Sequence, residues 1–470
     1  MDSIARLSEL AQRFLVERPK ELERPSGFVK RRTAQLDGPK FVQMCVLGWM
    51  NNASASYSQL NHVVASLDLH VRNQAIEERF GPASSKLLRH LLEEATGQLL
   101  QGQAVETPLF EPFAGGVFLQ DGSVVSLPNE LSTSWRGSGG PSGSNASGVR
   151  IQGRWEMRGG GLHGLWMQDA RRSQRQGPAK DSPYPEDSLR IVDTAYLSSA
   201  DMRAASQSRR FWITGVKADM LFSDQQGRLW NLTEWLRSLA ADEQVVEVWV
   251  RAGKREQVSV RLIALRLPQE VLRRRKQRAK REVERRPRRK GVQRCGRRPK
   301  PGAGRQPRKR AKKRHKVSVS KQRQLEWLLV LTNVESQLLA AEQVVALMRL
   351  RWQIELFWKL WKQEGKIDTW RSSKPQRILT ELYAKLLGLL LEHWVTLEGC
   401  WADPRRSLVK ARQVLQWTVS WLVLAIRGEV AWEVVLALMC SSMGSNCWTD
   451  RRQHPPSTFQ QLGDPKLCGS

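Results

Sequence analysis

A strongly basic segment divides this chain. Residues 273–316 hold 24 Lys or Arg against two Glu, so the segment carries +22 of the chain's net charge of +30. With four prolines and almost no apolar residues, it cannot bury a core and is expected to be disordered when free. Such a charge imbalance is typical of proteins that bind nucleic acid, and the segment is either a DNA contact or a solvated linker.

The first part of the chain, residues 1–105, has helical periodicity. Residues 58–80 have the pattern of a helix, a tight turn and a second helix. Such a pair can place side chains of its second helix in a major groove, here Arg72, Asn73 and Gln74. Any helical hairpin has the same pattern, so a purely structural role is the alternative to DNA binding.

From residue 106 the pattern changes to short strands separated by turns, which predicts an α/β fold. The expected strands cover residues 116–127, 149–157, 162–168, 189–193 and 211–215, with a helix at about 199–207. Residues 219–324 break this order, because two alternating runs at 244–252 and 257–267 lead into the basic segment. We interpret 219–324 as an insertion that is β-rich at first and then disordered over 273–316.

After the insertion, a strand at about 325–331 resumes the earlier pattern and helices follow to about residue 440. The expected organisation is a helical N-terminal region, a core in two parts, the insertion between them, and a C-terminal helical region with a tail. Their expected bounds are 1–105, 106–218, 219–324, 325–400 and 401–470. In the last region Leu415, Trp417, Trp421 and Leu424 either form a protein contact or pack on the core.

Residues 348–362 read as one amphipathic helix. Its apolar side chains fall within an arc of about 100°, which would pack on a core. These are Leu347, Leu350, Ile354, Phe357, Trp358 and Trp361. An adjacent arc of about 60° holds Met348, Arg351, Glu355 and Lys362, so the helix would present a carboxylate between two cations. Taken alone, this is also the pattern of an ordinary ion pair on a helix surface.

This segment resembles the signature of the DDE transposases of bacterial insertion sequences, specifically the insertion-sequence-four family. The signature is Tyr, two residues, Arg, three residues, Glu, six residues and Lys. Arg351, Glu355 and Lys362 match it in identity and spacing, whereas Met348 stands in place of Tyr.

Other segments resemble the same family, so the resemblance covers most of the chain. Residues 121–128 (DGSVVSLP) resemble the family's first-aspartate strand, and residues 189–198 (LRIVDTAYLS) resemble the second. Residues 330–333 resemble the strand before the Glu helix, and the family also carries a β-rich insertion. Gly215 departs from the pattern, because many members have Arg there.

The resemblance implies an RNase H-like mixed sheet flanked by helices, with Asp121, Asp193 and Glu355 as catalytic metal ligands. Phosphodiester transfer needs an activated nucleophile and a stabilised leaving oxygen, and two metal ions do both. Mg²⁺ prefers oxygen ligands and keeps several waters, so a few carboxylates suffice. We therefore expect Mg²⁺-dependent strand cleavage and transfer, with Mn²⁺ as a substitute.

The resemblance also assigns DNA contacts. Arg351 and Lys362 would hold phosphates, and Met348 occupies the position of a Tyr that contacts a phosphate near the cut. Because Met cannot donate that hydrogen bond, and because Gly215 also departs from the pattern, a catalytically impaired descendant that only binds DNA is the alternative. A basic nucleic-acid-binding protein that is not an enzyme is a further alternative.

The expected partner is double-stranded DNA, both the terminal inverted repeats of an element and a target, bound by a homodimer on paired ends. The six cysteines form no CxxC pair, so no zinc site is expected. No secretory signal or membrane-spanning stretch is expected, which predicts a cytoplasmic, nucleoid-associated protein. Trp230, Trp235 or Trp249 could stack on a flipped base, although packing in a β-rich core is the alternative.

Overall fold

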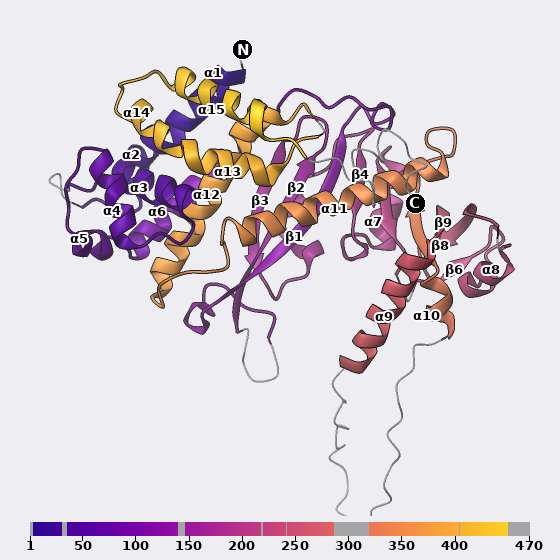
Figure 1. Cartoon of the computed structure of the whole chain (residues 1–470). Helices are drawn as coiled ribbons and strands as arrows, with labels where there is room; N and C mark the ends of the chain where they lie inside the picture. Colours follow the sequence, from indigo (N-terminus) through magenta and orange to yellow (C-terminus); the bar gives the residue numbers. More distant parts are fainter. Residues whose placement is uncertain are drawn as a thin grey trace, which may run out of the picture.

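The computed structural model describes residues 3–30, 35–139, 146–217, 220–240, 242–285, 319–403 and 405–449. Within them the chain forms one ten-stranded mixed sheet flanked by helices (Figure 1). The predicted α/β class is therefore confirmed. Residues 286–316 of the basic segment lie outside the described residues.

The first half of the sheet comes from the strands predicted before the insertion. They are β1 (Val117–Leu127), β2 (Ser147–Glu156), β3 (Leu162–Asp169), β4 (Leu189–Val192) and β5 (Phe211–Gly215). β3, β2 and β1 are antiparallel neighbours, and β4 and β5 both run parallel to β1. The carboxyl ends of β1, β4 and β5 therefore point to the same edge of the sheet.

The second half of the sheet contains strands from the insertion. β8 (Val245–Ala252) and β9 (Val258–Arg266) pair antiparallel, as predicted, and β9 then pairs antiparallel with β10 (Trp327–Thr332). The short strands β6 (Phe222–Ser223) and β7 (Leu229–Trp230) complete the sheet. The strands of the insertion therefore extend the main sheet.

The helix α9 (Gln269–Arg285) corrects the prediction that residues 273–316 have no regular structure. Over residues 273–285 that prediction is wrong, because buried Leu272 and Ala279 anchor the helix seven residues apart. Arg275 Nη1 also donates to the carbonyl of Trp327, at 3.2 Å. The composition predicted that this segment would make no contact with a core. Two buried apolar side chains and one hydrogen bond to a backbone carbonyl are nevertheless enough to hold its first part as a helix.

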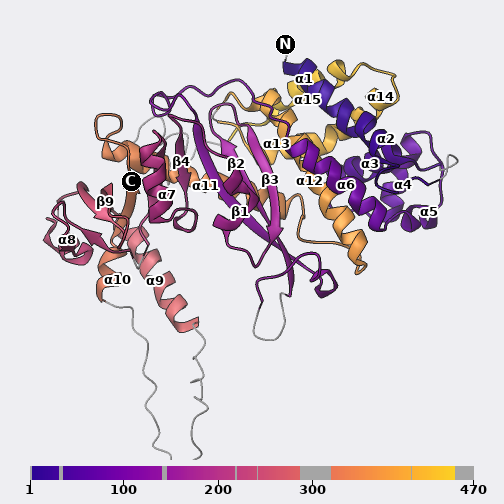
Figure 2. The ribbon, with the colours of Figure 1, turned by 180° about the vertical axis from the view of Figure 1, so that it is seen from behind.

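Two helices cover opposite faces of the sheet. α11 (Ala341–Gln363) crosses in front of it in Figure 1, and α7 (Ser199–Gln207) lies on the other face, nearest the viewer in Figure 2. Side chains alternate between the two faces of β1, which explains this arrangement. Val117, Leu119 and Val125 are fully buried in the same apolar cluster as the inner side of α11. The core thus fixes which face of β1 turns toward α11.

The N-terminal and C-terminal helices form one helical body beside β3 (Figure 1). Its centre is α12 (Pro375–Cys400), which is buried along most of its length and packs against α3, α6 and α15. The other helices of this body are α1 (Ser3–Gln12), α2 (Arg18–Leu22), α3 (Gly38–Asn51), α4 (Tyr57–Ser66), α5 (Asn73–Glu78), α6 (Pro82–Thr96), α13 (Leu408–Thr418), α14 (Leu422–Ile426) and α15 (Trp432–Asn446). In the described part of the chain, no helix is long and apolar enough to cross a membrane.

The C-terminal helices combine both alternatives considered for Leu415 and its neighbours. Leu415 is buried at 1% exposure, so it packs on the core. Trp417 is 84% exposed, and Trp421 and Leu424 are also exposed. Of the four residues, Trp417, Trp421 and Leu424 are therefore available for a protein contact.

Candidate active site

Asp121 and Asp193 lie at the same level on neighbouring parallel strands. Gln120 of β1 pairs with Val192 of β4, and each aspartate is the next residue along its strand direction. Asp193 directly follows β4, where its side chain accepts a hydrogen bond from the backbone N–H of Thr194 at 2.7 Å. Sheet register therefore brings together two carboxylates that are distant in the sequence.

Glu355 reaches this region from α11. The six apolar side chains predicted to face the core are all buried, from Leu347 to Trp361, so the predicted orientation of the helix is confirmed. α11 packs on β1 and β4, and Glu355 lies on its partly exposed side. The helix thus carries the third carboxylate across the two strands that hold the aspartates.

The pKa of Asp121 responds to charged groups at the end of β4 and on α11. The pKa of Asp121 is raised to about 6, mainly by burial, and the carboxylates of Glu355 and Asp193 act in the same direction. A hydrogen bond from the backbone of Gly122 and the charge of Arg351 act on this pKa in the opposite direction. Crowded like charges in a partly buried site are typical of functional positions.

Both predicted phosphate-binding cations have protein partners. Arg351 Nη1 lies 2.6 Å from Glu355 Oε1, so the ion pair expected on the helix surface is present. Lys362 Nζ donates to the carbonyl oxygen of Val124 at 2.9 Å. Both cations therefore lie at the site face of α11, and both would have to exchange partners to bind DNA.

The three carboxylates have the donor chemistry that Mg²⁺ prefers, but they are not arranged as ligands. Among the described residues, no group of three or more His, Cys, Asp or Glu side chains has a geometry that could hold a metal ion. Glu355 is turned to Arg351 and Asp193 is exposed. A metal would therefore have to draw these side chains together.

Two departures from the family pattern, Met348 and Gly215, lie at or beside these acids. Met348 is partly buried at the edge of the apolar cluster, one helical turn before Arg351. Gly215 ends β5, and a Cβ atom placed on it would lie 3.4 Å from the side chain of Thr194, the residue after Asp193. A longer side chain at position 215 would thus border the site.

Arg72, Asn73 and Gln74 lie on a different element. The predicted helix pair is present as α4 and α5, but α5 begins only at Asn73. All three side chains are exposed. The amide of Asn73 is held between Ser58 and Asn61 of α4 by hydrogen bonds of 3.1 and 3.0 Å. Gln74 in turn donates to Glu78 at 3.0 Å. DNA reading by this helix pair stays a prediction.

The insertion tryptophans differ in their surroundings. Trp230 and Trp235 contact one another with tilted rings whose centroids lie 5.4 Å apart, and Trp230 also contacts Phe222. These two rings therefore pack in the small core of the insertion. Trp249 is 38% exposed on β8. Trp352, which the sequence analysis did not single out, is 54% exposed on α11 beside Arg351.

Tyr196 is a second residue that the sequence analysis did not single out. It lies in the turn after Asp193, and its buried hydroxyl forms no hydrogen bond with any described residue. A Cβ atom at Gly122 would lie 3.2 Å from this hydroxyl. Burial, followed by the carboxylate of Asp121, raises the pKa of Tyr196. A single tyrosine in a turn carries no sequence signal that separates this position from ordinary packing.

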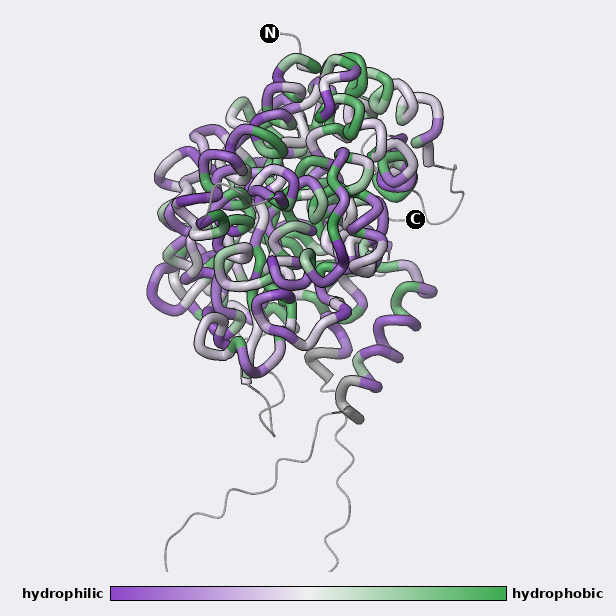
Figure 3. The backbone as a smooth tube through the Cα atoms, turned by 90° about the vertical axis from the view of Figure 1, so that its left-hand side faces the viewer, coloured by the Kyte–Doolittle hydropathy of each residue, from purple (hydrophilic) through white to green (hydrophobic). Residues whose placement is uncertain are grey.

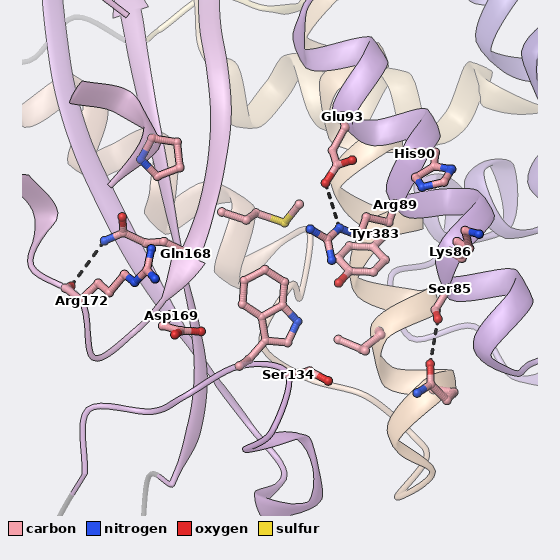
Figure 4. A pocket seen from close by; sticks show the side chains of 15 residues that line it. Ser85, Lys86, Arg89, His90, Glu93, Ser134, Gln168, Asp169, Arg172 and Tyr383 are labelled. Carbon is pink, nitrogen blue, oxygen red and sulfur yellow. Dashed lines mark hydrogen bonds and ion pairs between the residues drawn. The ribbon is translucent and has the colours of Figure 1, made fainter. Parts of the chain in front are cut away.

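A polar pocket of about 630 Å³ lies between α6, α12 and the edge strand β3 (Figure 4). Its labelled side chains include Arg89, which donates to Glu93 at 2.8 Å, and Ser85, which donates to Gln376 at 2.7 Å. None of the three acids lines this pocket. It is therefore separate from the acidic site.

Residues 117–391 match the family model described as "Transposase DDE domain". The chain is 23% identical over 411 residues to the transposase for insertion sequence element IS231F of Bacillus thuringiensis subsp. israelensis, which covers 82% of this chain and 78% of that protein. It is 22% identical over 410 residues to the transposase for IS1151 of Clostridium perfringens, covering 81% and 78%. The matched region contains all five core strands, α11 and the three acids, so the chain belongs to the family of DDE transposases of insertion sequences.

Proposed function

We propose that this transposase cuts and joins DNA strands with Asp121, Asp193 and Glu355 as the ligands of its metal ions. The observation that carries the proposal is the register of β1 and β4, which places two carboxylates side by side. The pKa of Asp121, which Glu355 and Asp193 both raise, supports the presence of a third carboxylate at the same place. Neighbouring like charges cost stability, and their retention is expected at a functional site.

Mg²⁺ fits these donors, and Mn²⁺ is expected to replace it. Two such ions would activate a water or a 3′-hydroxyl and stabilise the leaving oxygen. In the protein, Glu355 would turn from Arg351 toward the aspartates, and the backbone of Gly122 would hold Asp121 in place. The released guanidinium of Arg351 would then be free for a phosphate.

Arg351 and Lys362 would orient the DNA strand. A guanidinium binds phosphate oxygens in a bidentate fork, whereas an ammonium acts as a point charge. Both side chains lie on the face of α11 that carries Glu355, so a phosphate bound by them would lie next to the acids. Met348 would border the same phosphate without donating a hydrogen bond.

The second candidate function is DNA binding by a catalytically impaired transposase. Met348 and Gly215 favour it, because both replace polar family residues beside the acids. All three carboxylates are nevertheless present, and both Glu355 and Asp193 act on the pKa of Asp121. We therefore place active cleavage first.

The remaining features of the proposal follow from the family. The five strands in the order β3-β2-β1-β4-β5, with α11 across them, support an RNase H-like core. The proposed substrates are double-stranded DNA ends with terminal inverted repeats and a target DNA, held by a homodimer. Because chromosomal DNA is the proposed substrate, we expect the protein to act at the bacterial nucleoid in the cytoplasm.

A cleavage assay with the full chain separates the two functions. Labelled duplexes carrying the DNA that flanks this reading frame on each side are incubated with Mg²⁺, Mn²⁺ or a chelator, beside a gel-shift titration. Metal-dependent nicking at a fixed position supports the first function. Binding without cleavage in either metal supports the impaired transposase.

A further inference from the structure

We infer that α9 is a DNA-binding arm that contacts the phosphate backbone within about one helical turn of the cleaved bond. The inference deepens the proposed function, on which it rests, by assigning a surface to the DNA next to the acids. The inference depends on three features of α9: where the helix leaves the sheet, how it is anchored, and the charge that it exposes.

Strand directions place α9 at the edge of the sheet that holds the acids. β5 runs parallel to β4, β10 is antiparallel to β5, and β9 is antiparallel to β10. β9 therefore runs in the same direction as β1 and β4. α9 begins three residues after β9 ends, so it leaves the sheet on the side where Asp193 follows β4. Figure 1 shows α9 projecting downward from the sheet.

The pairing also sets the distance between α9 and the acids. β9 lies three strands from β4, which corresponds to about 14 Å across the sheet. Ile191, Ile213, Thr332 and Arg261 lie at one level across these strands. Asp193 lies two residues beyond that level and Arg266 lies five residues beyond it, so β9 ends about 10 Å past Asp193 along the strands. This spacing matches phosphates roughly half a turn to one turn of DNA away from the acids.

The anchoring of α9 keeps the helix at this edge. Leu272, Arg275 and Ala279 lie on one side of the helix, with both apolar members buried. Arg275 donates to Trp327 at the start of β10, and Lys276 Nζ lies 3.8 Å from Glu326. Figure 3 shows the same helix projecting from the body at the lower right, mostly in the colour of hydrophilic residues.

The exposed side of α9 is strongly basic. The 17 residues of the helix contain eight Lys or Arg and three Glu. Arg273, Arg278, Lys280 and Arg281 are all exposed. A 17-residue helix is about 25 Å long, which is enough to follow several successive phosphates.

Charge, rather than an apolar face, is what α9 offers to a partner. A basic amphipathic helix that binds a membrane inserts a broad apolar face into it. In α9, Leu272 and Ala279 are already buried in the protein. Among the described side chains of α9, Val271 is the one large apolar side chain that is exposed, with an exposed fraction of 38%. A polyanionic DNA strand fits both the positive charge of α9 and its position on the side of the sheet where Asp193 follows β4.

The first test compares two double variants at opposite ends of β9. Arg278→Gln with Arg281→Gln removes two charges from α9. The control, Lys254→Gln with Arg255→Gln, removes two exposed charges from the turn before β9, at the opposite edge of the sheet. Affinity for a fluorescent 40-base-pair duplex of mixed sequence is measured from 50 to 200 mM salt.

We expect the slope of log affinity against log salt to flatten by about 1 to 2 for the α9 variant, because each lost phosphate contact releases about one counterion fewer. The control should keep the parent slope. Equal slopes for both variants, or an unchanged slope for the α9 variant, would overturn the inference. Because only binding is measured, a chain that cannot cut DNA gives the same result.

The second test places the contact. A photo-crosslinking residue, p-benzoylphenylalanine, replaces exposed Gln277 of α9 or exposed Gln207, which ends α7 at the opposite edge. The Gln277 variant should crosslink to a duplex carrying the flanking DNA of the gene, within about ten base pairs of the cut. Crosslinking from Gln207 alone, or from Gln277 only at distant positions, would contradict the proposed place of α9. Loss of cutting with normal crosslinking would instead count against the proposed function.

Discussion

Arg351 and Glu355 form an ion pair of 2.6 Å on the exposed side of α11. Pairs of this kind, four residues apart and partly solvated, contribute only about 0.3–0.5 kcal/mol. The pair can therefore be exchanged for stronger partners at little cost. We interpret it as the resting arrangement of a site in which Glu355 would bind metal and Arg351 would bind phosphate.

Replacing Arg351 by Gln should affect metal and DNA in opposite directions. Removing a cation beside three carboxylates should strengthen Mn²⁺ binding, by on the order of 1 kcal/mol. The same change should weaken binding of DNA, because a phosphate contact is lost. Isothermal titration with Mn²⁺ and a gel shift measure the two effects.

Arg349→Gln is the matched control for this prediction, since it removes the same charge two residues away, on another side of α11. It should leave the affinity for Mn²⁺ near that of the parent. If Arg351→Gln lowers both affinities together, Arg351 holds Glu355 in its working position and the interpretation as an exchangeable pair is wrong.

Met348→Tyr should strengthen binding of the flanking DNA without harming the fold. Met348 is only partly buried at the edge of the apolar cluster, so a larger side chain can extend toward solvent. A charge-assisted hydrogen bond from the new hydroxyl to a phosphate would contribute about 1–2 kcal/mol. Met348→Phe supplies the ring without the hydroxyl. Equal affinities of the Tyr and Phe variants in a gel-shift titration would show that the hydroxyl has no role.

Local pattern predicted much of the fold. The strands around Asp121 and Asp193 and the orientation of α11 follow from periodicity, because side chains alternate in strands and repeat every 3.6 residues in helices. The pairing of β9 with β10 could not be predicted, since an alternating run does not name its partner. The anchoring of α9 also escaped prediction, because it depends on the distant carbonyl of Trp327.

Proximity in the site was less predictable than the identity of its residues. The resemblance named the three acids, but the register that aligns Gln120 with Val192 is a property of the folded sheet. Tyr196 and Trp352 could not be recognised from sequence, because burial of a hydroxyl and exposure of an indole depend on tertiary packing.

His393 should make the protein acid-labile. Burial lowers the pKa of His393 from 6.5 to about 4, and its Nε2 lies 2.9 Å from the carbonyl oxygen of Gly160. The folded-state pKa of His393 lies below its unfolded value, so burial of the neutral imidazole is compatible with folding at full stability above pH 6.5. This stability is lost as the pH falls toward 4, because the unfolded chain then binds a proton that the folded chain does not. The loss amounts to up to about 3 kcal/mol.

His393→Gln tests this by urea unfolding between pH 7 and pH 4. The variant should be less stable at pH 7, because packing against Trp155 and Phe357 is lost, but its stability should fall less steeply with acid. The same change at exposed His62 removes a histidine without touching the core. An unchanged acid slope for His393→Gln would mean that other groups cause the acid sensitivity.

Leu415 and Trp417 should respond differently although they are two residues apart on α13. Leu415→Ala should lower the free energy of unfolding by about 2–4 kcal/mol, because it leaves a cavity in a packed core. Trp417→Ser should change it by less than about 0.5 kcal/mol, because the side chain is 84% exposed. Sedimentation velocity of each variant bound to DNA then shows whether Trp417 contributes to assembly of the complex. A large loss of monomer stability in Trp417→Ser would contradict its exposure.

The central claim is that Glu355 acts with Asp121 and Asp193 in strand cleavage. Glu355→Gln keeps the size of the side chain and the helix propensity, and it removes one of three anionic ligands. Glu342→Gln is the matched control, with the same chemical change in the first turn of α11, where the side chain is exposed.

Both variants are compared with the parent for nicking of a labelled flanking-DNA duplex with Mg²⁺ and Mn²⁺, beside a gel shift. We predict that Glu355→Gln binds the duplex but does not cut it, that Asp121→Asn and Asp193→Asn behave alike, and that Glu342→Gln cuts as the parent does. Cleavage by Glu355→Gln at the parent rate would contradict the account and leave the Arg351–Glu355 pair as an ordinary surface ion pair.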